Sequence, residues 1–175
     1  MQTVGTLLLN YIFPSFQDTF FIGALLAVSI QGSMLINADG DIGRHITIGN
    51  YITDHWTIPT SDIFSHTMYG ERLVPHEWLA QWIFSRFNVW MGLDGVVAVT
   101  AILVGTAFTL TYHEIRKRGS HVIVALAVAS LAGFASSLHW IARPHVFTFV
   151  FVAIWTYLLA DNKSKVWYFP IIMLV

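Results

Sequence analysis

Long apolar stretches without a charged residue are the feature that most restricts what this chain can fold into. A helix that crosses a bilayer needs about 20 mainly apolar residues, and a charge at its centre costs roughly 2.5–3.5 kcal/mol on insertion scales. Four such stretches occur, at residues 19–38, 95–112, 122–142 and 145–160, and a fifth apolar run covers residues 166–175. The sequence therefore predicts an all-α integral membrane protein with about five transmembrane helices, the last of them incomplete.

The amino-acid composition supports a membrane protein and excludes several other classes. Hydrophobic residues make up 55% of the 175 residues and charged residues only 11%, whereas soluble domains average about 25% charged residues. So little charge cannot cover a water-facing surface, which excludes an ordinary soluble enzyme. The formal net charge of −1 gives no electrostatic basis for binding nucleic acid. The absence of cysteine excludes disulfides, thiolate metal sites and thioether-linked haem.

The short loops between the apolar stretches predict the orientation in the membrane. The loops at residues 113–121 and 161–165 carry five basic residues, whereas the loop between the third and fourth stretches carries only Arg143. Because basic residues are enriched in cytoplasmic loops, we expect these two loops and the N-terminus on the cytoplasmic side. Residues 1–18 are expected to form an interfacial segment. Residues 39–94 then form a long extracytoplasmic loop.

The long loop holds most of the acidic residues, three arginines and four histidines, so we expect function to reside there. Asp41 and His45 are four residues apart, a spacing that places two side chains on the same face of a helix. The isoleucines that follow Asp41 predict a short amphipathic helix lying in the membrane interface. A second amphipathic helix is expected to open near Pro75, after a proline- and hydroxyl-rich turn at residues 58–67.

Ionisable residues gather near one predicted membrane face. Charged groups at a membrane boundary are costly enough to indicate function, although a solvated helix cap is the simpler alternative for any one of them. Asp41 and His45 could share a metal ion or a proton. The guanidinium group of Arg143 could hold a lipid phosphate or extend into the headgroup layer. The candidate residues on this face are Asp39, Asp41, Arg44, His45, His76, Glu77 and Arg143.

Five short segments resemble one family of membrane proteins. They are residues 39–45 (Asp-Gly-Asp-Ile-Gly-Arg-His), 49–52 (Gly-Asn-Tyr-Ile), 58–65 (Ile-Pro-Thr-Ser-Asp-Ile-Phe-Ser), 76–79 (His-Glu-Trp-Leu) and 143–147 (Arg-Pro-His-Val-Phe). The first four resemble the first extracytoplasmic loop of bacterial multi-spanning proteins related to the GT-C glycosyltransferases. The fifth resembles a later arginine–proline turn of those proteins.

The resemblance implies an enzyme of the bacterial inner membrane that transfers a sugar from a polyprenyl phosphate, or a catalytically silent relative of such an enzyme. In such enzymes an aspartate of the first outer loop is the base for the acceptor or a metal ligand. Asp41 or Asp39 would take that role here, supported by His45, and the two aspartates would be the ligands of Mg²⁺ or Mn²⁺. The substrate-binding residues would be Arg143, Arg44, His76 and Glu77.

The sequence also leaves open a non-catalytic role. The chain would then be an integral subunit of a larger respiratory or photosynthetic membrane complex, with other membrane subunits as its partners. His139 and His145 lie near the ends of predicted spans, and neutral imidazole is a good axial ligand for haem or chlorophyll. Transport is a weaker alternative, because the predicted spans lack the charged residues that line an ion path.

Overall fold

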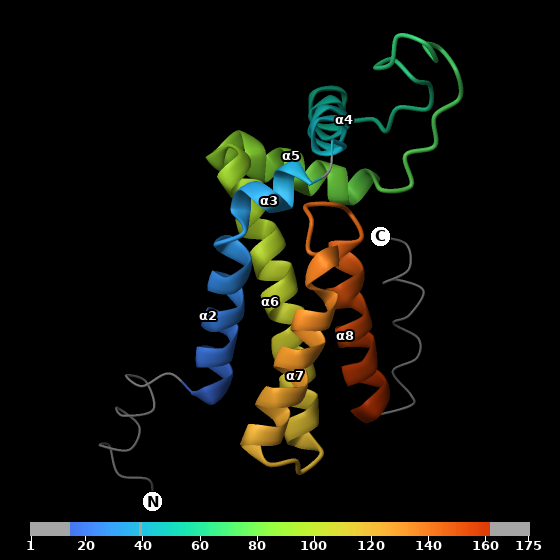
Figure 1. The fold of residues 1–175 in the computed structure, drawn as a ribbon. Coiled ribbons are helices and arrows are strands. Elements are labelled where there is room, and N and C mark those ends of the chain that lie inside the picture. Colours follow the sequence, from blue (N-terminus) through green and yellow to red (C-terminus); the bar gives the residue numbers. More distant parts are fainter. Residues whose placement is uncertain (1–14, 39, 162–175) are drawn as a thin grey trace, which may run out of the picture.

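The computed structural model describes residues 15–38 and 40–161, which fold into α-helices and a 3₁₀ turn (Figure 1). The elements are α2 (Phe16–Ser29), α3 (Gly32–Asn37), α4 (Ile42–His55), α5 (Trp78–Met91), α6 (Leu93–Lys117), α7 (Val122–Ser136), η1 (Ser137–His139) and α8 (Val146–Asp161). These residues form no strand beyond an isolated bridge between Ser61 and Arg72. The predicted all-α fold is therefore confirmed for the described part of the chain.

Four helices form a bundle, and three others gather at one end of it. α6 is central and contacts α2, α5, α7 and α8. Helices α3, α4 and α5 lie at the end of the bundle where α6 begins, and α5 runs across that end (Figure 1). The loop that joins α6 to α7 lies at the opposite end. The fold thus consists of a helical bundle and a cap made of α4, α5 and the loop between them.

The side chains of α6 explain its central position. Small and β-branched residues recur along this helix and are buried; they are Val96, Val97, Val99, Thr100, Ala101, Val104 and Ala107. The Thr100 hydroxyl donates a hydrogen bond to the carbonyl of Val96 at 2.8 Å, so its polar atom is satisfied within the helix. A Cβ atom on Gly105 would lie 3.2 Å from the ring of Phe21, which shows how closely α2 approaches. Neighbouring helices can therefore pack on several sides of α6.

Within the residues that the structure describes, two helical segments are long and apolar enough to cross a membrane by length and composition, namely Leu93–Lys117 and Val122–His139. The apolar helices Phe16–Ser29 and Val146–Ala160 are shorter. The predicted fifth span, residues 166–175, and most of the predicted interfacial segment lie outside the described residues. The five-span arrangement therefore stays a prediction.

The helix ends differ from the limits of the apolar stretches, because hydrogen-bonded caps and turns set them. The stretch at residues 19–38 forms two helices, α2 and α3, instead of one. Helix α2 begins three residues before this stretch, where the side chains of Ser15 and Asp18 form a reciprocal capping box. The stretch at residues 95–112 lies within the longer helix α6, which continues through polar and charged residues to Lys117.

The crossing of α4 and α5 depends on Gly49. A Cβ atom at this position would lie 2.2 Å from the carbonyl oxygen of Gln81 and 2.6 Å from the Cβ of Ser85. Only glycine, which has no side chain, allows the two backbones to approach so closely. Beside this contact, Arg86 Nη2 donates a hydrogen bond to Asn50 Oδ1 at 3.1 Å. The close crossing brings the first turns of α4 and α5 together.

We expect Gly49→Ala to destabilise the protein by about 1–3 kcal/mol, because the added methyl group overlaps the backbone of α5. Gly43→Ala on the same helix is the matched control. A Cβ atom at Gly43 meets no atom within 4 Å, so this change should stabilise the helix by about 0.5–1 kcal/mol. Thermal unfolding followed by circular dichroism measures both variants. Equal unfolding temperatures for the two would contradict the close crossing.

Candidate functional site

Three segments that are far apart in the sequence meet where the cap joins the bundle. Asp41 is the N-cap residue of α4, and Glu77 is the N-cap residue of α5. Arg143 lies in the turn between η1 and α8. This turn is attached to α3 by a hydrogen bond from the Ala142 N–H to the carbonyl of Leu35, at 2.9 Å. The backbone thus holds the arginine beside the start of α4.

The carboxylate of Asp41 lies between two guanidinium groups. Arg143 Nη2 donates a hydrogen bond to Asp41 Oδ2 at 3.1 Å, and Arg44 Nε lies 3.8 Å from Asp41 Oδ1. The three side chains are between 41% and 49% exposed. Solvent therefore screens these pairs, and each contributes at most about 1 kcal/mol to stability. The same exposure leaves all three charged groups accessible to a ligand.

Glu77 is the second carboxylate of the site. Its Oε2 atom lies 3.9 Å from Arg44 Nη2 and also 3.9 Å from His45 Nδ1. Its Oε1 atom lies 3.9 Å from Nε2 of the exposed His76. Arg44 therefore lies between the two carboxylates. We use the name Asp41–Glu77 cluster for the six residues Asp41, Arg44, His45, His76, Glu77 and Arg143.

His45 is the buried member of the Asp41–Glu77 cluster, with only 1% of its surface exposed. Burial lowers the pKa of His45, and the nearby charge of Arg44 lowers it further, while the carboxylates of Glu77 and Asp41 act in the opposite direction. The ring is therefore neutral at pH 7. In that form its Nδ1 atom accepts from the side-chain amide of Gln81, whose nitrogen lies 3.4 Å away. A proton added to Nδ1 would face Glu77.

The sequence predicted that these residues lie at one face, and the structure brings six of them together at one end of the bundle. The seventh, Asp39, lies outside the described residues. Sequence reasoning missed Gln81, which is almost fully buried and contacts His45. Its position four residues after Glu77 was the available signal, because that spacing places both side chains on one helix face.

The described members of the Asp41–Glu77 cluster do not suit a divalent metal ion. Mg²⁺ and Mn²⁺ favour several oxygen ligands, but the charged groups beside Asp41 are the guanidinium groups of Arg44 and Arg143. Within residues 15–38 and 40–161, no three histidine, aspartate or glutamate side chains are grouped as metal ligands. A metal site formed by Asp39 and Asp41 stays a prediction, because the first of these residues is not described.

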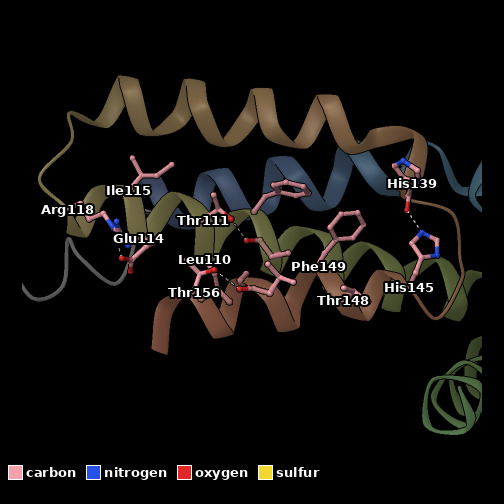
Figure 2. A pocket seen from close by; sticks show the side chains of 14 residues that line it. Leu110, Thr111, Glu114, Ile115, Arg118, His139, His145, Thr148, Phe149 and Thr156 are labelled. Atoms are coloured by element: carbon pink, nitrogen blue, oxygen red, sulfur yellow. Dashed lines mark hydrogen bonds and ion pairs between the residues drawn. The ribbon is translucent and has the colours of Figure 1, made fainter. Parts of the chain in front are cut away.

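His139 and His145 lie near the Asp41–Glu77 cluster but outside it. Their ring centroids are 6.4 Å apart and the rings are nearly perpendicular. His145 Nε2 donates a hydrogen bond to the carbonyl oxygen of His139 at 2.8 Å, as Figure 2 shows. This bond leaves Nδ1 as the ring nitrogen of His145 that could coordinate the metal of haem or chlorophyll. Ligation of haem or chlorophyll by these histidines stays a prediction.

An apolar groove of about 410 Å³ opens beside the Asp41–Glu77 cluster. Its polar end is lined by His76, Glu77 and His145, and its wall continues along α8 through aromatic side chains that include Phe147 and Phe151. A ligand with a charged head and an apolar tail could therefore contact the cluster and α8 together.

Comparison of the chain with protein-family models, curated proteins and solved structures finds no match.

We expect the protein to lose stability as the pH falls below about 6.5, the ordinary pKa of histidine. The unfolded chain takes up a proton at His45 in this range, whereas the folded chain, with its lowered pKa, does not. His45 therefore supports folding fully above this pH and progressively less below it. Unfolding temperatures measured between pH 8 and pH 5 should fall less steeply for His45→Gln than for the unmodified chain.

The matched control for this pH dependence is His66→Gln, which changes an exposed histidine of the same cap. This variant should keep the full pH dependence of the unmodified chain. If the unfolding temperatures of His45→Gln and His66→Gln both fell with pH as steeply as that of the unmodified chain, the loss of stability at low pH would not come from the buried imidazole of His45.

Proposed function

We propose that the chain is an integral membrane protein of the bacterial inner membrane whose helical bundle crosses the lipid layer. The surface of the bundle supports this. Only 17% of the apolar segment Val122–His139 is buried within the protein, and large side chains such as Leu131 and Phe134 are more than two-thirds exposed. Contiguous apolar surface of this kind is unfavourable in water. Lipid chains would cover it at no such cost.

The proposed orientation follows from the two ends of the bundle. The C-terminal end of α6, next to the loop to α7, carries Arg116, Lys117 and Arg118. Helices α4 and α5, which begin at the two carboxylates of the Asp41–Glu77 cluster, lie at the opposite end of the bundle (Figure 1). Because basic loops remain on the cytoplasmic side, the cluster would face the outside of the cell. The predicted five-span topology belongs to this proposal, with α2 in place of one continuous helix over residues 19–38 as its first span.

Single cysteines test this topology cleanly, because the chain has none of its own. We expect Thr67→Cys, in the exposed loop before α5, to react with a membrane-impermeant maleimide in intact cells. His121→Cys, in the exposed loop between α6 and α7, should react only after the membrane is permeabilised. The reverse pattern would overturn the orientation, and reaction of both cysteines in intact cells would overturn the membrane-spanning bundle.

We further propose that the protein is a GT-C-like glycosyltransferase that uses a lipid-phosphate-linked sugar. One observation carries this proposal. An accessible carboxylate, Asp41, lies beside two accessible guanidinium groups, and one of these comes from a segment 102 positions away in the chain. Such exposed pairs contribute little to folding. Their assembly at one end of the bundle is therefore better explained by the binding of a ligand that carries both a phosphate and a hydroxyl group.

The proposed reaction assigns a separate task to each charge. Asp41 accepts the proton of the acceptor hydroxyl while that oxygen bonds to the anomeric carbon of the sugar. The bond from this carbon to the lipid phosphate breaks, and its electron pair moves to the phosphate oxygen. Arg143 or Arg44 stabilises the negative charge that grows there. To do so, the arginine must turn from Asp41 towards the phosphate, which their partial exposure allows.

Further support comes from the surroundings of these charges. The apolar groove along α8 begins at Glu77 and His76, so an isoprenoid chain lying in it would bring its phosphate to the Asp41–Glu77 cluster. Neutral His45 lies buried behind Glu77, with its Nδ1 atom 3.9 Å from Glu77 Oε2.

We expect Asp41→Asn to lower sugar transfer from a polyprenyl-phosphate sugar by about 100-fold or more, because the amide cannot accept the proton. Asp54→Asn is the matched control, since Asp54 is an exposed aspartate on the same helix, and it should retain full activity. Transfer is measured with the purified full chain in lipid vesicles. Equal transfer by both variants would remove Asp41 from the reaction. No transfer by the unmodified chain would favour the non-catalytic membrane subunit.

A further inference from the structure

A second and larger cavity lies between α6 and α8, on the lipid-facing part of the proposed bundle. Its volume is about 830 Å³, within the range of roughly 300–1,000 Å³ that is usual for small-ligand sites. Figure 2 shows Glu114 and Arg118 at one end of this cavity and the two histidines, His139 and His145, at the other. The proposed sugar transfer makes no use of the end near Glu114.

Glu114 is a buried carboxylate with one oxygen satisfied and the other not. The residue is only 8% exposed, and its Oε1 accepts a hydrogen bond from Arg118 Nε at 2.8 Å. Its Oε2 atom is buried and has no hydrogen-bond partner within the described part of the chain. A buried charged oxygen without a donor is costly, so a partner for it is expected. Because Glu114 lines the cavity, a molecule bound there could supply that donor.

The walls between the two ends of the cavity are apolar. Leu110, Phe149 and Val152 line them. Three threonines also line the cavity, and Thr148 lies towards its histidine end (Figure 2). The other two bond to their own helices, with the Thr111 hydroxyl 2.9 Å from the Ala107 carbonyl and the Thr156 hydroxyl 2.8 Å from the Val152 carbonyl. They offer no free donor to Glu114, and their methyl groups add to the apolar wall. The cavity therefore suits a hydrocarbon chain with a polar group at the Glu114 end.

The charges at that end select the type of headgroup. Glu114 Oε2 lacks a donor, and a carboxylate favours a cationic one, while the side chain of Arg118 is 63% exposed and its guanidinium group favours an anion. We propose that the α6–α8 cavity binds one aminophospholipid. Its primary ammonium group donates to Glu114 Oε2, its phosphate contacts Arg118, and one acyl chain lies along the cavity. Phosphatidylcholine has no ammonium N–H to donate, and phosphatidylglycerol has no cation, so both fit less well.

This proposal depends on the membrane placement but not on the sugar transfer. The probe is phosphatidylethanolamine with a photoreactive acyl chain, added to the full chain in bilayers of phosphatidylglycerol. Illumination should label peptides of α6 and α8 that line the cavity. The same probe with a choline headgroup should label them about tenfold less, the effect expected when one charge-assisted hydrogen bond is lost. Equal labelling by both headgroups would overturn the proposal.

Three variants connect the labelling to the cavity. Glu114→Gln should lower labelling by phosphatidylethanolamine about tenfold, whereas Glu71→Gln, which changes an exposed glutamate of the cap, should leave it unchanged. If Glu114→Gln does not fold, Leu110→Trp tests the same site, because the larger ring fills the cavity without altering the carboxylate. Full labelling of the Leu110→Trp variant would overturn the proposal. So would a cross-link that places residues 166–175 in the cavity in place of lipid.

Discussion

Burial of α6 among its neighbours is the constraint on which the rest of the structure depends. Valines and alanines along this helix are almost fully removed from solvent, and α2, α5, α7 and α8 all contact it. In a bundle that crosses a lipid layer, as proposed, close van der Waals packing of small side chains holds such helices together, because lipid chains are as apolar as the side chains themselves. Because α5 packs against α6, and α4 crosses α5 at Gly49, the position of the cap follows from the position of α6. The site is therefore assembled on a supporting helix that supplies none of its charges.

The Asp41–Glu77 cluster combines two kinds of polar group with different physical roles. Asp41, Arg44 and Arg143 are partly exposed, and their ion pairs are screened by solvent. His45 is buried and neutral at pH 7, and its ring contacts the amide of Gln81. The exposed charges are available to a ligand, whereas the buried imidazole couples protonation to the packing of α4 against α5. This division explains how one cluster can be both accessible and part of the folded core.

The two ends of the bundle differ in how carboxylates and arginines are arranged. At the cap end, a carboxylate lies between two arginines and beside an apolar groove. At the other end, the buried carboxylate of Glu114 faces an apolar cavity and is paired with Arg118. An anionic headgroup suits the first arrangement, and a zwitterionic headgroup suits the second. If the bundle crosses a bilayer as proposed, these two ends would meet different leaflets.

Much of the helical content was predictable because hydrophobic length is a local property of the chain. The stretches at residues 95–112 and 122–142 each contain much of a helix, and the two amphipathic segments of the cap are also helical. The break between α2 and α3 was missed because the prediction relied on the absence of charge, and the polar residues at the break, Ser29, Gln31 and Ser33, are uncharged. The extension of α6 to Lys117 was missed for a related reason, since the polar residues there still support a helix.

The sequence by itself determined which residues carry charge near the predicted membrane boundary, and the spacing of Asp41 and His45 on one helix follows from local geometry alone. Only the tertiary structure decided that Arg143 contacts Asp41, that Glu77 lies between Arg44 and two histidines, and that Gln81 completes the surroundings of His45. These contacts join segments up to 102 positions apart. They depend on how closely α4 can cross α5 and on the hydrogen bond that holds the turn at Ala142 against α3, and no local pattern encodes either.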